Sequence, residues 1–172
     1  MYNILIALLT LTNLSDIYQF SMPAIGGGTT IHFSDFKGKK ILVVNTASGS
    51  PYAEQYARLE QLYQQYKDKL VIVAVPSNDF QHETGSEQAI QNQVSSMYHV
   101  HYLLTGKASV TGAGACDLYR WLTTGPESGA MSSTVIKDFQ KYLVGTDGHV
   151  IAYFNGAVDP MDQSIQDLIN IP

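Results

Sequence analysis

The sequence predicts an α/β fold in a single domain. Short apolar runs rich in β-branched residues alternate along the chain with longer segments in which apolar residues recur every three or four positions. The chain has 172 residues, which is enough for one domain with a buried core. With 45% apolar and 15% charged residues, the composition excludes a disordered tail or a fibre.

The expected strands come in two groups. The runs at residues 41–45 and 70–75 are apolar throughout their centres, as is typical of parallel strands covered on both faces. A shorter strand is expected near residues 30–33, after a turn built on three successive glycines. Later strands at 139–144 and 150–154 are joined by Thr146-Asp147-Gly148, which predicts a β-hairpin.

Helical spacing is expected in four segments, at residues 52–67, 86–97, 117–122 and 162–169. The resulting order is strand, helix, strand, helix, then a hairpin and a closing helix. This order is typical of a thioredoxin-like α/β domain with a central mixed sheet flanked by helices. Periodicity alone leaves other α/β sandwiches open.

Charge and the N-terminal segment limit the possible partners and locations. A net charge of −5, with 10 Lys and Arg against 15 Asp and Glu, disfavours a nucleic-acid partner. Residues 1–14 contain the apolar run Ile4 to Leu9, which is too short for an integral membrane span. The run is either the core of a signal peptide or a short packed element, so export to the periplasm and a cytoplasmic location are equally supported. Residues 15–172 form the expected domain.

Five short motifs follow one another over most of the chain. They are Asp16-Ile17-Tyr18-Gln19-Phe20, FSDFKGK at residues 33–39, NTAS at 45–48 with Gln55, Tyr56 and Leu59 after it, PSNDF at 76–80, and FQKYLV at 139–144. In this order they resemble the glutathione peroxidase family, particularly its short bacterial form. The resemblance implies a thioredoxin-like fold. It also implies hydroperoxide reduction in an oxidative-stress lineage, with glutathione or thioredoxin as the reductant where activity is retained.

The family's catalytic set is replaced at the matching positions. The family uses a nucleophilic cysteine or selenocysteine, assisted by a glutamine, a tryptophan and an asparagine. These four positions correspond to Ser50, to His82 (or Gln81 if the gap shifts), to Lys137 and to Asp138. The resolving cysteine of thioredoxin-dependent members falls on Val94, and the glycine after the nucleophile falls on Pro51. The sequence therefore predicts a peroxidase scaffold without peroxidase activity, a pseudoenzyme.

Two other chemistries remain as alternatives. Cys116 is the only cysteine, so the chain has no internal disulfide, and this residue is the one possible nucleophile for a residual thiol peroxidase. Ser50, His82 and Asp138 lie at positions that converge in the family, which allows a hydrolase of the Ser-His-Asp type.

The remaining expectations concern metals, packing and assembly. His99 and His101 are able to share one face of a strand, but no third ligand is evident, and neither a metal nor a cofactor is predicted. Trp121 matches a packing residue of the family. The segment from Leu104 to Gly129 holds no long insertion, so a monomer is expected.

Overall fold

A mixed β-sheet forms the centre of the protein. The computed structural model describes residues 15–129 and 131–172, and the expectations for residues 1–14 lie outside this range. Within the described part, the sheet has the strand order β5-β4-β3-β6-β7. The parallel strands are β3 (Lys40–Thr46), β4 (Leu70–Pro76) and β5 (Leu103–Leu104). The antiparallel strands β6 (Lys141–Val144) and β7 (Val150–Phe154) complete it.

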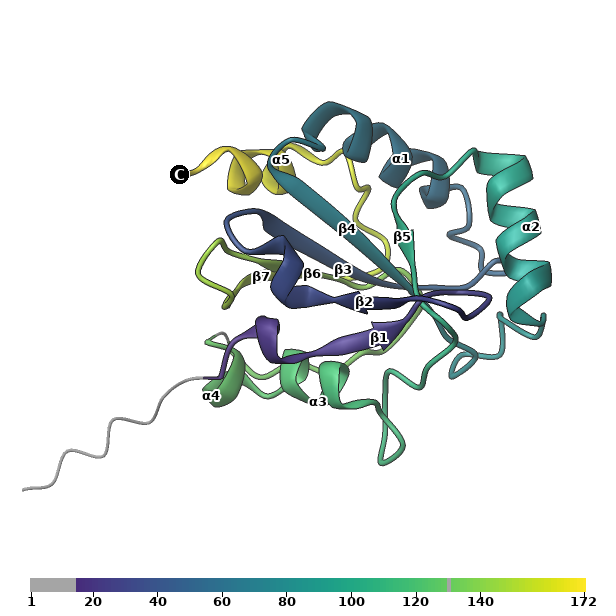
Figure 1. Ribbon diagram of the computed structural model, residues 1–172, viewed down its shortest axis with the longest axis horizontal. Coiled ribbons are helices and arrows are strands. Elements are labelled where there is room, and N and C mark those ends of the chain that lie inside the picture. The colour runs from purple at the N-terminus through teal and green to yellow at the C-terminus, as the bar shows by residue number, and fades with distance from the viewer. Residues whose placement is uncertain (1–14, 130) are drawn as a thin grey trace, which may run out of the picture.

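Helices and short elements cover the two faces of this sheet (Figure 1). On one face lie α1 (Gln55–Tyr66), α2 (Glu87–Tyr98) and α5 (Gln163–Asn170). On the other lie the 3₁₀ segments η1 (Ile17–Gln19) and η2 (Phe33–Phe36), the hairpin of β1 (Ser21–Pro23) and β2 (Thr30–His32), and the helices α3 (Asp117–Thr123) and α4 (Gly125–Ser128). The prediction of a thioredoxin-like fold with a mixed, helix-flanked sheet is confirmed.

The sheet divides the core into two apolar clusters. Side chains of a strand alternate between its faces, and every residue of β3 is buried. Ile41 and Val43 pack into the cluster that contains α3, whereas Leu42 and Val44 pack into the cluster that contains α1, α2 and α5. Burial on both faces explains the continuous apolar run at residues 41–44.

Several expected boundaries are wrong, each for a local reason. The strand expected from residue 139 begins at Lys141, because Phe139 has a φ of 60° and leaves the extended conformation. The helix expected from residue 52 begins at Gln55, after a series of turns. Phe33 begins η2 instead of ending a strand. The strand expected from residue 41 begins one residue earlier, at the buried Lys40. The sequence does not predict β1, β5 and α4, because two to four residues are too few to show a period.

The two edges of the sheet differ. At the β5 edge, the Ile25 N–H donates to the Leu104 carbonyl at 3.0 Å, and Ala24 forms a β-bridge with Thr105. That edge is therefore covered by the loop after β1. At the opposite edge, no strand of the described residues pairs with the outer side of β7.

None of the helices described in residues 15–129 and 131–172 is long and apolar enough to cross a membrane.

Candidate functional site

The loop that follows β3 is held by its own backbone and by Glu83. Glu83 is fully buried, and its carboxylate accepts hydrogen bonds from the Ser48 N–H at 2.6 Å and the Ser48 hydroxyl at 2.7 Å. The Gly49 N–H donates to the His82 carbonyl at 3.0 Å. The segment that carries His82 and Glu83 is therefore fastened directly beside the loop.

Ser50 lies buried in this loop, with both its hydroxyl and its backbone engaged. Its N–H donates to the Ala47 carbonyl at 3.2 Å, and its carbonyl accepts from the Ala53 N–H at 3.0 Å. The Ser50 Oγ accepts from the Tyr52 N–H at 3.2 Å. Pro51 has no N–H to offer. Every backbone N–H from residue 48 to residue 53 thus has an acceptor within the protein, and the loop presents none of these donors to a bound anion.

His82 and Asp138 form the closest side-chain pair of the site. The His82 Nδ1 lies 2.6 Å from the Asp138 Oδ2. Asp138 is only 2% exposed, whereas the imidazole is 42% exposed. The Asp138 Oδ1 is buried without a protein partner. A buried carboxylate on one ring nitrogen orients the imidazole, and this arrangement leaves the other ring nitrogen for contact outside the pair.

Of the two positions considered for the family's glutamine, the structure brings only His82 to Asp138. Gln81 is exposed and has a left-handed backbone with a φ of 64°. Lys137 is half-buried, and its Nζ lies 5.7 Å from the centre of the Tyr52 ring. The structure therefore gathers His82, Asp138, Lys137 and the Ser50 loop at the carboxyl end of β3, while no Ser50–His82 hydrogen bond occurs among these described residues.

The Asp138 turn is fixed by the end of β3. The Asn45 Nδ2 donates to the Lys137 carbonyl at 3.0 Å, and the Phe139 N–H donates to the Asn45 carbonyl at 2.6 Å. A Cβ at Gly156 would lie 2.0 Å from the Asp138 carbonyl oxygen, so only glycine fits there. Phe139, which follows Asp138, has a left-handed backbone. This conformation is unfavourable for a residue with a Cβ, and the surrounding contacts impose it.

Sequence reasoning missed Lys141, which lies behind this turn. Its side chain is fully buried, and its Nζ donates to the Gln55 Oε1 at 2.6 Å and to the Phe139 carbonyl at 2.8 Å. Burial lowers the pKa of Lys141 to about 7, although Asp159 acts in the opposite direction. The sequence does contain a signal that could have pointed to Lys141, because a lysine inside an otherwise apolar strand is uncommon.

Cys116 lies apart from these residues. It precedes α3, on the face of the sheet opposite α1, and borders a cleft of about 410 Å³ lined also by Phe20, Met22 and Lys107. Burial raises the pKa of the Cys116 thiol, and Asp117 raises it further, against backbone N–H groups of α3 that lower it.

The other residues that the sequence analysis singled out have structural roles. His99 ends α2 in a left-handed conformation, so the expected strand face for His99 and His101 is wrong. His101 pairs with Glu60 at 2.8 Å, and no group of three potential metal-ligating side chains occurs in the described residues. Trp121 is buried against Phe20, which confirms its packing role, and Val94 is buried in α2.

Comparison with known proteins places this geometry in a family. Residues 17–123 match the family model of glutathione peroxidase. A glutathione peroxidase of Lactococcus lactis subsp. cremoris is 35% identical over 158 residues, which cover 90% of this chain and 99% of that protein. The glutathione peroxidase-like peroxiredoxin 2 of Saccharomyces cerevisiae is 35% identical over 148 residues, covering 83% of this chain and 91% of that protein.

Solved structures agree with this assignment. The crystal structure of Trgpx in its apo form is 31% identical, with a TM-score of 0.68 over 90% of this chain and 93% of that one. The structure of T. cruzi GPX1, at 21% identity, shares the fold with a TM-score of 0.67 over 90% of this chain and 92% of that one. The chain belongs to the glutathione peroxidase family.

Proposed function

We propose that this chain is a catalytically degenerate member of the glutathione peroxidase family, which keeps the scaffold but does not reduce hydroperoxides. The observation that carries the proposal is Ser50, at the position of the family's nucleophile, with its hydroxyl engaged by the Tyr52 N–H. In a thiol peroxidase, a thiolate attacks one peroxide oxygen and the O–O bond breaks. The sulfur is oxidised to a sulfenic acid, while the peroxide is reduced to an alcohol or water. A serine oxygen has no corresponding oxidised state.

The other replaced positions support the same proposal. Asp138 is paired with His82, so an anionic acceptor stands where the family has the asparagine donor. Lys137 extends toward Tyr52 where the family has a tryptophan. A carboxylate accepts hydrogen bonds but donates none when ionised, and it therefore does not supply the donors that stabilise a leaving oxygen.

Residual peroxidase chemistry through Cys116 is the first alternative, and the site gives it little support. The thiolate is the reactive form of cysteine, and a raised pKa lowers the thiolate fraction at neutral pH. Cys116 also lies outside the group formed by Ser50, His82 and Asp138, which leaves it without the residues of that loop.

Hydrolysis through Ser50 is a second candidate, favoured by the 2.6 Å contact between His82 and Asp138. An acyl-transfer enzyme also needs free donors for the oxyanion. The N–H groups around Ser50 are occupied within the loop, so we expect no reaction of Ser50 with a fluorophosphonate probe. Labelling that is lost in Ser50→Ala would support the hydrolase instead.

A coupled assay of peroxide reduction tests the main proposal. Hydrogen peroxide and a lipid hydroperoxide are offered with either glutathione or thioredoxin as the reductant. We expect the natural protein to show no turnover above background. The Ser50→Cys variant is run beside it, in a Cys116→Ser background so that only one thiol is present.

The controls separate the possible outcomes. Turnover by the natural protein that disappears in Cys116→Ser would replace our proposal with a residual thiol peroxidase. If turnover persists in the Cys116→Ser variant, which has no thiol, then this chain does not use the thiol mechanism of the family either. Turnover by the Ser50→Cys variant alone, with a sulfenic acid trapped on its introduced thiol, would show that the nucleophile was the decisive loss.

A further inference from the structure

Three segments of the chain meet at the buried amine of Lys141. The amine donates to the Phe139 carbonyl at 2.8 Å, in the turn that carries Asp138, and to the Gln55 Oε1 at 2.6 Å, at the start of α1. The Gln55 side-chain N–H donates in turn to the Gly156 carbonyl at 2.7 Å, in the loop after β7. Lys141 is fully buried and Gln55 is 9% exposed, so one amine joins the turn, the helix and the loop from inside the protein.

The turn that the amine holds is strained. Phe139 has a φ of 60°, which is unfavourable for a residue with a Cβ. Just before it, the Asp138 carbonyl oxygen lies so close to Gly156 that a Cβ there would be 2.0 Å away. A strained segment keeps its conformation only while its contacts hold it. Weakening the contact with Lys141 therefore favours a relaxed conformation of the turn.

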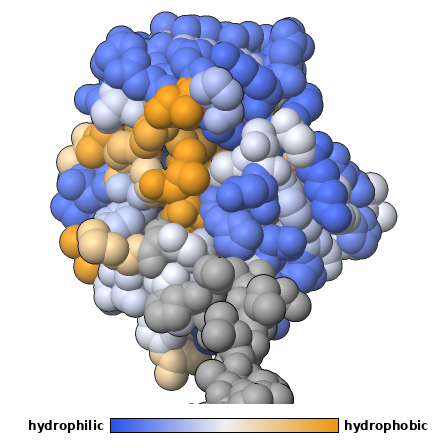
Figure 2. Space-filling view, turned by 90° about the vertical axis from the view of Figure 1, so that its left-hand side faces the viewer, coloured by the Kyte–Doolittle hydropathy of each residue, from blue (hydrophilic) through white to orange (hydrophobic). Residues whose placement is uncertain are grey.

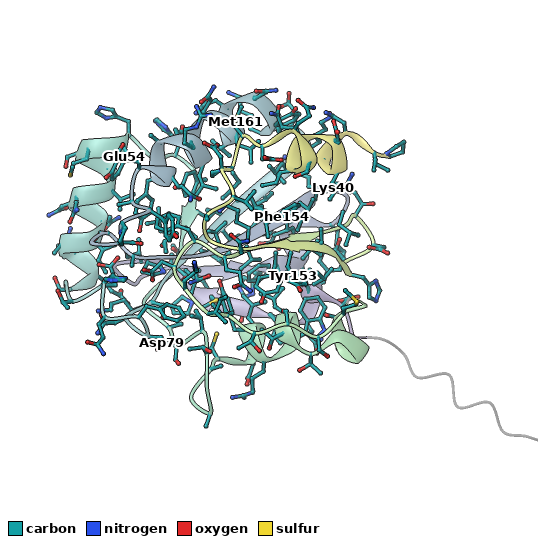
Figure 3. All side chains as sticks on the ribbon, turned by 180° about the vertical axis from the view of Figure 1, so that it is seen from behind. Lys40, Glu54, Asp79, Tyr153, Phe154 and Met161 are labelled. Carbon is teal, nitrogen blue, oxygen red and sulfur yellow. The ribbon has the colours of Figure 1, made fainter. Side chains whose placement is uncertain are left out.

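The side chains around Lys141 suit a neutral amine. Its partners in the sheet are Val44 of β3 and Phe154 of β7, both apolar, and Figure 3 shows Phe154 on its strand. The two N–H groups of a neutral amine are both accepted, by Gln55 and by Phe139. A proton adds a charge and a third N–H, for which no acceptor occurs in the part of the chain that the structure describes.

The charged side chains on these segments are paired elsewhere or exposed. Asp159, in the loop after β7, pairs with Arg58 of α1 at 3.1 Å, and Asp138 pairs with His82 at 2.6 Å. The remaining titratable groups of these segments are Glu54 and Asp162, both exposed, Lys137, whose Nζ lies near the Tyr52 ring, and the buried phenol of Tyr56. Within residues 15–129 and 131–172, no carboxylate lies within ion-pairing distance of the Lys141 amine.

Burial lowers the pKa of Lys141 to about 7, and Asp159 offsets this effect only in part. Solvent is close to the buried group, because Gln55 keeps some exposed surface and the outer surface of the layer that contains α1 and α5 is hydrophilic (Figure 2). A protonated amine can thus gain hydration through a local opening between α1 and the turn, without unfolding of the domain.

We propose that Lys141 is a proton-operated lock on the turn that carries Asp138. The neutral amine holds the turn against the start of α1, and uptake of one proton opens this contact and hydrates the amine. The site formed by His82 and Asp138 is thereby made sensitive to pH. The lock does not depend on whether the chain reduces hydroperoxides.

The direction of the effect follows from the number of bound protons. In the open form, Lys141 is solvated and titrates near the ordinary lysine pKa of about 10.4. Between about pH 7 and pH 10, the open form carries a proton that the closed form lacks, so each unit fall in pH raises the open-to-closed ratio about tenfold. Below about pH 7, both forms are protonated and the ratio is constant.

Amide hydrogen exchange of the full chain tests the lock. The Phe139 N–H donates to the Asn45 carbonyl at 2.6 Å and reports on the turn, whereas amides in the middle of β4 report on global unfolding. We expect the protection of Phe139, corrected for the intrinsic exchange rate, to fall about thirtyfold from about pH 8.5 to about pH 7. Low concentrations of urea should leave it unchanged, because a local opening exposes little surface.

Two variants fix the charge at this position. Lys141→Met has no amine to protonate and should lose the pH dependence. Lys141→Arg keeps its charge at every pH, so the Phe139 amide should be poorly protected throughout. The exposed Lys67→Met is the matched control and should behave like the natural protein. Protected β4 amides in each variant confirm that the domain is folded.

Several results would overturn the proposal. They are a Phe139 protection that does not change with pH in the natural protein, a pH dependence that persists in Lys141→Met, and a Phe139 amide that stays protected in Lys141→Arg. A Phe139 protection that equals that of the β4 amides, with the same urea dependence, overturns it too. Lys141 would then titrate only when the whole domain unfolds.

Discussion

Among the residues that the structure describes, Lys141 is a lysine whose side chain has no exposed surface. A lysine is ordinarily charged at neutral pH, yet this one is fully buried with two neutral acceptors, Gln55 and the Phe139 carbonyl. A neutral amine has two N–H groups, which is enough to donate one hydrogen bond to each of these acceptors. Burial explains why the pKa falls to about 7.

This residue should make stability depend on pH. Above pH 7, the unfolded chain keeps a proton on Lys141 that the folded chain has released. The free energy of unfolding should therefore rise between about pH 7 and pH 10, at up to about 1.4 kcal/mol per pH unit from this group. Below pH 7, both states are protonated and this contribution is flat. Urea unfolding at several pH values measures the slope.

The Lys141→Met variant should lose this slope, and the exposed Lys67→Met variant should keep it. An unchanged slope in Lys141→Met would mean that Lys141 titrates in the folded protein much as it does in the unfolded chain.

At the scale of elements, the β6–β7 hairpin connects the sheet to the start of the described chain. The Gly148 carbonyl accepts from the Ile17 N–H at 3.0 Å, and the Tyr18 hydroxyl donates to the Thr146 carbonyl at 2.8 Å. Gly148 has a φ of 85°, a conformation that a residue with a Cβ adopts only with strain. One glycine therefore serves both the turn and the docking of η1.

Gly148→Ala should destabilise the protein by about 2 to 4 kcal/mol, because the left-handed backbone and the overpacking contribute together. A Cβ there would lie 2.7 Å from the Tyr18 ring. Gly27→Ala is the control, since it has a similar φ of 76° and no atom within 4 Å of the added Cβ. It should cost only about 1 kcal/mol in thermal or urea unfolding. Equal losses in the two variants would show that contact with Tyr18 contributes nothing.

The elements show where sequence reasoning succeeds and where it stops. The two long parallel strands and the helices α1 and α2 are predictable, because buried runs and three-and-four spacing extend over enough residues to be visible. The start of β6 is not, because the left-handed Phe139 depends on contacts with Asn45 from a distant strand. At the candidate site, the motifs indicate the positions of Ser50, His82 and Asp138. The His82–Asp138 contact and the occupied N–H groups of the Ser50 loop require the three-dimensional structure.

For the whole molecule, the sheet joins the two apolar clusters into one structure. The strand β3 contributes Ile41 and Val43 to one cluster and Leu42 and Val44 to the other, so neither cluster survives without the same strand. Trp121, the single tryptophan, lies in the cluster of α3, while most helical residues pack on the opposite face. Trp121 fluorescence therefore reports on the face that carries α3, whereas far-ultraviolet circular dichroism reports mainly on the helices of the opposite face.

Unfolding should therefore be a single cooperative transition. We expect the urea midpoints from Trp121 fluorescence and from far-ultraviolet circular dichroism to coincide. Ile41→Ala, directed into the Trp121 cluster, should shift both midpoints together. Separated midpoints would show that the α3 face unfolds independently of the helices α1, α2 and α5.

The close approach at Gly156 has a consequence for reading evolution in this family. The space there is closed by the backbone oxygen of Asp138, not by any reacting group. Selection for folding alone should thus preserve this glycine in any member of the family, with or without a peroxidatic nucleophile. A glycine retained at this position in a distant sequence would record descent from the same architecture and would carry no information about whether that descendant still acts on peroxides.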